Sequence, residues 1–142
     1  MKKTLITLLA VAIAAPCAAL ALRAQSSDAA PPTTHEVRMV MEGTTYRFEP
    51  ANLTIRTGDH VRFTTVSGGP HNVAFDPAKV PDAAKARLSA GMPGQIQPLS
   101  GALVINAGDS YTVSFAGVPA GRYEFFCMPH MGMNMKAVIT VQ

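Results

Sequence analysis

Short alternating runs separated by turn residues are the feature that most constrains the fold of this chain. In residues 60–66, for example, Val61, Phe63 and Thr65 share one face. A period of two is typical of a β-strand with one face on a core. Other short runs that favour strands, not all of them alternating, cover residues 37–48 (broken at Glu42 and Gly43), 53–56, 71–75, 102–105, 111–115, 122–126 and 137–141. Seven to eight short strands predict an all-β domain, built as a β-sandwich or a small barrel.

One segment between the strands has a different pattern. Residues 81–88 contain good helix formers, begin with Pro81, and are followed by Gly91. Proline in the first turn and glycine after the last are helix boundary signals. We therefore expect one short helix here, followed by a loop over residues 91–98.

The first 24 residues have the pattern of a secretory signal peptide. Two lysines precede a long apolar run, and small residues follow it. We expect cleavage after Ala24 or Ala21 and export to the periplasm or beyond, with a retained membrane anchor as the alternative. Residues 25–34 are polar and rich in proline, which predicts a flexible tether. The folded domain is then expected to span residues 35–142.

Loss of the leader changes the charge balance. The full chain has 12 basic and 9 acidic residues, a net charge of +3. Because Lys2, Lys3 and Arg23 lie in the leader, the mature chain has nine residues of each sign. A near-neutral domain gives no electrostatic reason to expect nucleic acid or an anionic membrane as a partner.

One stretch near the C-terminus gathers possible copper ligands. It contains a cysteine, a histidine three residues later, and three methionines at every second position: Cys127, His130, Met131, Met133 and Met135. Thiolate, imidazole and thioether form the ligand set that suits copper. His71 lies in another loop beside a strand and can supply a second imidazole, since strands distant in sequence can lie side by side in a sandwich.

The cysteine count supports this interpretation. Cys17 lies in the leader, so Cys127 is the only thiol expected in the mature chain. A lone thiol in an exported protein is a liability unless it is bound or buried. The other two histidines, His35 and His60, are expected to be surface residues rather than ligands.

The spacing Cys127-x2-His130-x4-Met135, with the upstream sequence Pro70-His71-Asn72-Val73, resembles the type I (blue) copper proteins of the cupredoxin family. Within that family it is most similar to plastocyanin and pseudoazurin, over about residues 35–142. The resemblance implies a Greek-key β-sandwich and one copper ion held by His71, Cys127, His130 and Met135. It also implies single-electron transfer between redox partners.

Enzymatic roles do not fit this ligand set. Four ligands leave no open position for a substrate on the metal. The His-x-His pairs of multicopper oxidases and copper nitrite reductases are absent, and a binuclear CuA site needs two cysteines in the loop. The alternative function is a copper-binding carrier or chaperone of the same fold, because the methionine run resembles Met-rich Cu(I)-binding surfaces.

In the family one methionine is the weak, axial copper ligand, and two positions of this chain depart from the family pattern. Met135 fits the start of the last strand better than Met133, which would suit a shorter loop. Met128 stands where the family often has Ser or Thr tied to the asparagine after the first ligand histidine, so Asn72 is expected to brace the loop through backbone groups. Phe126 stands where plastocyanins often have tyrosine.

A monomer is expected, with donor and acceptor docking transiently on an apolar face around His130.

Overall fold

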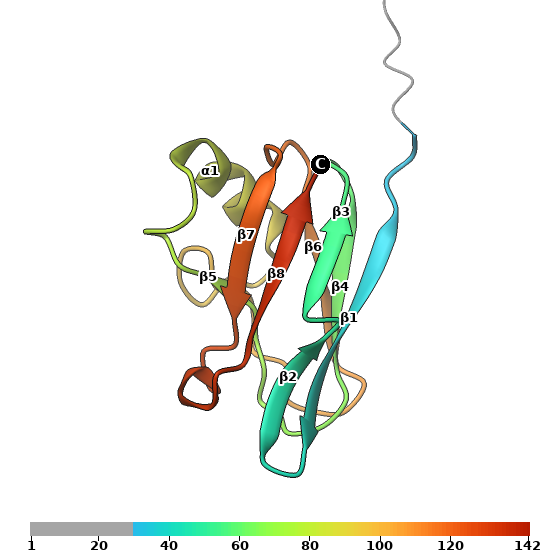
Figure 1. The fold of residues 1–142 in the computed structure, drawn as a ribbon, viewed down its shortest axis with the longest axis vertical. Coiled ribbons are helices and arrows are strands. Elements are labelled where there is room, and N and C mark those ends of the chain that lie inside the picture. The colour runs from blue at the N-terminus through green and yellow to red at the C-terminus, as the bar shows by residue number, and fades with distance from the viewer. Residues whose placement is uncertain (1–29) are drawn as a thin grey trace, which may run out of the picture. The chain divides into compact units, whose positions relative to one another are not determined.

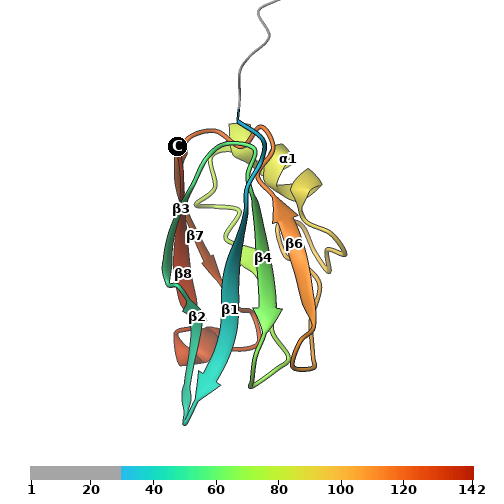
Figure 2. The ribbon, with the colours of Figure 1, turned by 90° about the vertical axis from the view of Figure 1, so that its right-hand side faces the viewer.

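A computed structural model describes residues 30–142, and these residues confirm the predicted fold class. They form two four-stranded sheets and one short α-helix (Figures 1 and 2). The expected signal peptide, residues 1–24, lies outside the described residues, as does the first half of the expected tether, 25–34. No helix within residues 30–142 is long and apolar enough to cross a membrane.

Both sheets mix parallel and antiparallel neighbours. The first has the order β2-β1-β4-β6 and the second the order β3-β8-β7-β5. Strands β1 and β4 are parallel, as are β3 and β8, whereas the other neighbours are antiparallel. The bounds are β1 Thr34–Glu42, β2 Thr45–Glu49, β3 Asn52–Ile55, β4 His60–Thr65, β5 Ala74–Phe75, β6 Ser110–Ser114, β7 Gly121–Phe126 and β8 Lys136–Val141.

An aromatic cluster joins the two sheets at the centre of the core. Phe125 of β7 lies 4.7 Å from Phe48 and 5.6 Å from Phe63 of the other sheet, measured between ring centroids, with both pairs edge to face. Phe75 of β5 lies 6.0 Å from the same ring. Edge-to-face pairs of buried rings stabilise the core beyond the gain from burying their apolar surface. Because Phe125 is two residues from Cys127, this cluster also fixes the end of β7.

Two predicted strands differ from the structure. The prediction of a strand at 102–105 was wrong, since only Val104 pairs, in a single bridge with His71. The predicted strand at 71–75 is shorter, with β5 covering only its last two residues. Leu103 and Ile105 are 45% and 64% exposed. The apolar run at 102–105 therefore forms an extended loop beside His71 rather than a strand with a buried face.

The predicted helix is present and longer than expected. Helix α1 spans Asp82–Gly91 and buries Ala84 and Leu88. It ends on Gly91 instead of before it. A Cβ atom at Gly91 would collide with the carbonyl of Ser114 in β6, so the absent side chain lets the helix end pack against that strand.

Asp59 holds the start of β1 against the turn before β4 through hydrogen bonds. Its carboxylate is almost fully buried and accepts hydrogen bonds of 2.9 Å from the backbone N–H groups of Thr33 and Arg56 and from the His35 ring. Thr33 falls within the expected tether, but this bond holds it to the domain. Burial alone would raise the pKa of Asp59, but the three hydrogen bonds outweigh that effect and hold the pKa at about 2.

This lowered pKa predicts acid sensitivity. The stabilisation by Asp59 should be complete above pH 4 and lost as the pH falls from about 4 to about 2, because the unfolded carboxyl binds its proton first. Asp59→Asn should lower the free energy of unfolding by on the order of 2 kcal/mol at neutral pH and flatten its decline below pH 4. Denaturant unfolding across this pH range measures both effects.

Glu36→Gln is the control for this experiment. Glu36 lies on the same edge of the domain, in an exposed ion pair with Arg62, and exposed pairs contribute little to stability. Its pH profile should follow that of the wild type. Parallel profiles for Asp59→Asn and the wild type would contradict the stabilising role of Asp59.

Candidate metal centre

Two segments far apart in sequence bring the predicted ligand residues together. His71 lies between β4 and β5, and the other three residues lie in the β7–β8 loop. Both segments lie at the end of the sheets opposite the C-terminus and α1 (Figure 1). The β1–β2 hairpin, which turns at Gly43, reaches the same end.

Three donor atoms form a compact buried group. Cys127 Sγ lies 3.3 Å from His130 Nδ1 and 3.7 Å from His71 Nδ1. All three atoms lie within 4.8 Å of one another, and all three residues are buried. Ligands bound to one first-row metal ion at about 2.0–2.3 Å are themselves about 3.5 Å apart. The spacing and the thiolate–imidazole chemistry of this group therefore fit copper.

Hydrogen bonding and burial set the protonation states of the histidines. His71 Nε2 donates a 2.8 Å hydrogen bond to the carbonyl of Ser67, which leaves the lone pair on Nδ1, the atom facing Cys127. Burial lowers the pKa of His71, and burial together with the nearby His71 ring lowers the pKa of His130. Both rings therefore stay neutral near pH 7, which is the form that binds a metal.

The Cys127 thiol experiences opposing effects. Burial raises its pKa, while the backbone N–H groups of Asn72 and His130 lower it by stabilising the thiolate. Because a metal binds the thiolate, metal binding at this group is coupled to release of the thiol proton.

The β7–β8 loop is braced by its own backbone. Cys127 N–H donates to the carbonyl of Met135 at 3.1 Å, which joins the two ends of the loop. Within the loop, a 3-10 turn at Met131–Met133 follows His130 and ends at Asn134, which has a left-handed φ of 58°. These contacts restrict how far the loop can move, so the spacing between its sulfur and imidazole groups is defined by main-chain geometry.

Burial separates the three methionines that follow His130. Met135 is completely buried, whereas Met131 and Met133 are 54% and 53% exposed. Phe126 and Lys136 pair across β7 and β8, so Cys127 and Met135 are the next residues beyond that pair. Both side chains are fully buried, so Met135 alone of the three thioethers lies inside the domain.

Asn72 braces the cysteine loop, as the sequence predicted. Its Oδ1 accepts a 2.8 Å hydrogen bond from the backbone N–H of Met128. The two residues directly follow His71 and Cys127 in the chain. The bond therefore links the two segments that carry these side chains.

Tyr46 of β2 makes a contact that the sequence did not predict. Its ring stacks on His130 with centroids 3.9 Å apart and planes inclined by 20°, and it lies edge-on to His71 at 6.2 Å. Together with its surroundings, this ring leaves His130 only 6% exposed. Position 46 looked like an ordinary strand residue, and no local pattern indicates that the hairpin folds over the histidine.

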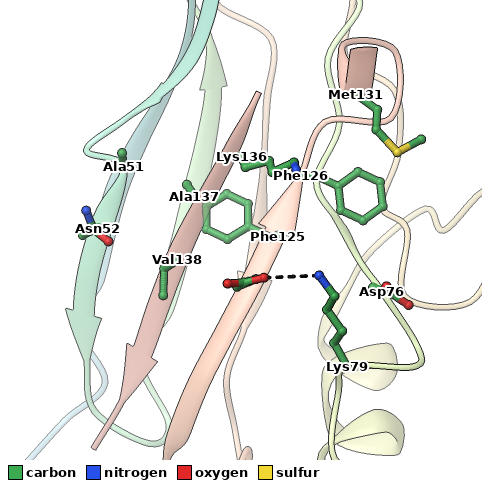
Figure 3. Close-up of a pocket in the computed structure, with 11 residues that line it drawn as sticks. Ala51, Asn52, Asp76, Lys79, Phe125, Phe126, Met131, Lys136, Ala137 and Val138 are labelled. Carbon is green, nitrogen blue, oxygen red and sulfur yellow. Dashed lines mark hydrogen bonds and ion pairs between the residues drawn. The ribbon is translucent and has the colours of Figure 1, made fainter. Parts of the chain in front are cut away.

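An open groove lies beside Phe126, on the outer face of the second sheet. Figure 3 shows Phe126 and Met131 towards one end and Lys79, which forms an ion pair with Glu124, towards the other. Asp76 and Lys136 complete a mixed set of charges around it. Phe126 is half-buried here and carries no hydroxyl group.

The remaining described histidines lie outside the donor group. His35 binds Asp59, and His60 lies in β4 at the start of the strand. Neither belongs to the metal-ligating group found among residues 30–142.

Sequence comparison finds that the chain is similar to known copper-binding proteins. Residues 35–142 match the model of copper binding proteins of the plastocyanin/azurin family. A plastocyanin from Nostoc punctiforme is 38% identical over 110 residues, covering 77% of this chain and 74% of the relative. A plastocyanin from Scenedesmus fuscus is 41% identical over 96 residues, covering 67% and 86%.

Solved structures show the same fold. Oxidised plastocyanin from the fern Dryopteris crassirhizoma superposes with a TM-score of 0.60 at 30% identity, covering 75% of this chain and 99% of the other. A pseudoazurin from Methylobacterium extorquens gives a TM-score of 0.51 at 26% identity, covering 76% and 74%.

The stack of Tyr46 on His130 should stabilise the domain. Tyr46→Leu should lower the free energy of unfolding of the metal-free protein by about 1 kcal/mol, because an aromatic stack is lost. Tyr46→Phe keeps the stacked ring and should cost much less. Denaturant unfolding of the three proteins tests this, and equal losses in both variants would contradict a role for stacking.

Proposed function

The chain belongs to the plastocyanin/azurin family of copper-binding proteins, and from that premise we propose that His71, Cys127, His130 and Met135 hold the single copper ion of a type I electron carrier. The buried group of His71 Nδ1, Cys127 Sγ and His130 Nδ1, all within 4.8 Å, carries this proposal. When bound, copper supplies a one-electron Cu(I)/Cu(II) couple, which soft sulfur and imidazole ligands together accommodate.

The residues around the site hold the donors in place. Ser67 fixes the orientation of the His71 ring through its carbonyl, and Tyr46 covers one face of the His130 ring. The backbone hydrogen bond from Cys127 N–H to the Met135 carbonyl closes the loop that carries the sulfur ligands. Burial of the group excludes water, so little rearrangement of protein or solvent need accompany the gain or loss of an electron.

Burial supports Met135 as the axial ligand. A thioether at the surface cannot reach a buried ion, and Met133 is half exposed in the 3-10 turn. Met135 is fully buried and emerges next to Cys127 at the base of the loop. With four protein donors no coordination position remains for a substrate, which agrees with an electron carrier rather than an enzyme.

Apolar side chains around the histidine loops support a docking face for donor and acceptor proteins. Met131 and Met133 are exposed beside His130, while Leu103 and Ile105 are exposed on either side of Val104, the bridge partner of His71. Small apolar faces suit brief encounters between redox proteins. A monomer exported through its N-terminal signal peptide would meet such partners outside the cytoplasm.

The exposed thioethers of Met131 and Met133 also favour the second candidate, a copper carrier or chaperone. Cu(I) exchange distinguishes the two functions. An electron carrier retains copper in both oxidation states, whereas a chaperone would release Cu(I) readily to an acceptor and show no intense colour when oxidised.

Removal of the thiolate tests the ligand set. The copper-loaded protein should show an intense thiolate-to-Cu(II) absorption band, and Cys127→Ala should abolish it. His60→Gln, a change at a histidine outside the donor group, should leave the band intact. Visible spectra at matched copper content measure this, and a band that survives Cys127→Ala would overturn the assignment.

Paired substitutions test the axial ligand. Met135→Leu should keep the colour and raise the reduction potential on the order of 60 mV, a tenfold change in the one-electron equilibrium constant, because loss of the thioether disfavours Cu(II). Met133→Leu should leave the potential near that of the wild type. If voltammetry shows the reverse pattern, Met133 is the axial ligand and the assignment of Met135 is wrong.

A further inference from the structure

A buried hydroxyl group occupies the space beside Met128. Ser100 is 1% exposed, and its Oγ–H donates to Met128 Sδ at 2.9 Å. The same oxygen accepts a 3.0 Å hydrogen bond from Asn72 Nδ2. Because Asn72 Oδ1 also accepts from the backbone N–H of Met128, the three residues form a closed ring of hydrogen bonds.

This ring connects the two segments that carry the proposed ligands. Asn72 directly follows His71, and Met128 directly follows Cys127. The backbone N–H of Asn72 also acts to lower the pKa of Cys127, because it stabilises negative charge on the sulfur. Any change in how Asn72 is held therefore acts on the position of His71 and on the hydrogen bonding of the thiolate.

The loop before Ser100 is folded in a way that presents its hydroxyl. Leu99 has a φ of 61°, a left-handed conformation that costs a non-glycine residue about 1–2 kcal/mol. Its N–H donates to the Gln95 side chain at 3.0 Å, and its carbonyl accepts from Phe75 at 2.9 Å. Such a conformation persists where surrounding contacts determine it, and here it turns Ser100 towards Asn72.

We propose that Ser100 is a positioning residue for the metal centre: through Asn72 and Met128 its hydroxyl holds the His71 and Cys127 segments in register. It supplies from a distant loop the side-chain hydroxyl that a methionine at position 128 cannot provide. The inference rests on the proposed function, since positioning requires that His71 and Cys127 act as ligands.

Loss of the hydroxyl should have a definite electronic effect. Without Ser100 Oγ, Asn72 Nδ2 keeps only a longer contact of 3.4 Å to the carbonyl of Gly101. A loosened Asn72 weakens the stabilisation that its backbone N–H gives to negative charge on the Cys127 sulfur. N–H donors stabilise negative charge on a ligand sulfur, and that charge is greatest in the reduced state. The reduction potential should therefore fall.

Three substitutions test the proposal. Ser100→Ala removes the hydroxyl, Ser100→Thr retains it, and Ser110→Ala removes an exposed hydroxyl at the start of β6 as a control. In the metal-free protein, Ser100→Ala should lower the folding equilibrium constant about thirtyfold, the effect of the two hydrogen bonds that the hydroxyl makes to Met128 and Asn72. In the copper-loaded protein it should shift the thiolate band and lower the potential. Ser100→Thr should restore both, and Ser110→Ala should match the wild type.

Met128→Leu provides an arm that does not depend on folding of the alanine variant. It keeps the apolar volume and removes the sulfur acceptor, so it should lower the potential in the same direction. In the metal-free wild type, the Asn72 side-chain amide protons should exchange slowly with solvent by NMR. Once position 100 is alanine, Met128→Leu should cause little further loss of stability, because the two changes act on one interaction.

The outcomes separate this proposal from the one it rests on. A wild-type protein that shows no thiolate-to-Cu(II) band with copper bound overturns the proposed function. A blue wild type in which Ser100→Ala and Met128→Leu leave the band and potential like those of Ser110→Ala overturns the positioning role. A loss of stability alone, with unchanged band and potential, makes Ser100 a packing residue and also overturns it.

Discussion

The pairing of β7 with β8 is the constraint on which the metal centre depends. The antiparallel ladder runs from Gly121–Val141 to Phe126–Lys136, and one further bond from Cys127 N–H to the Met135 carbonyl closes it. The nine residues from Cys127 to Met135 therefore start and end at neighbouring points. Packing of Phe125 against rings from both sheets holds the ladder in place. The core thus fixes the positions of Cys127 and the buried Met135, and the loop between them places His130 beside Cys127.

The second half of the site is attached through hydrogen bonds rather than through a strand ladder. His71 is held by its β-bridge to Val104 and by the hydrogen bond from its ring to the Ser67 carbonyl. The Asn72 side chain accepts a hydrogen bond from the backbone N–H of Met128. Tyr111 adds a further anchor, because its buried hydroxyl accepts a 2.7 Å hydrogen bond from the backbone N–H of Val73. Burial raises the pKa of that hydroxyl, so it stays neutral. One half of the site is therefore positioned by the β7–β8 ladder and the other half by the hydrogen bonds of the loop that carries His71. These hydrogen bonds limit how far the His71 segment can move.

Much of this arrangement could be predicted from the sequence because its signals are local. Alternation indicated the strands, Pro81 and Gly91 placed the helix, and the spacing from Cys127 to Met135 indicated a copper-binding family. The strand predicted at 102–105 was wrong because a short run of apolar residues can be extended without pairing along its length. Tyr46 and Ser100 were missed because their contacts with His130 and Met128 span about 84 and 28 residues of sequence. Such contacts depend on how distant loops meet at one end of the sheets, which no local pattern encodes.

As an electron carrier, this one buried site would cycle a single electron without releasing its metal. A redox titration of the copper-loaded protein, followed through the thiolate-to-Cu(II) band under anaerobic conditions, tests it most directly. The expected result is a one-electron Nernst curve that is traced identically on reduction and reoxidation, with full recovery of the band and no copper in the filtrate. Hysteresis, loss of Cu(I) on reduction, or the absence of a band in the oxidised protein would contradict the claim.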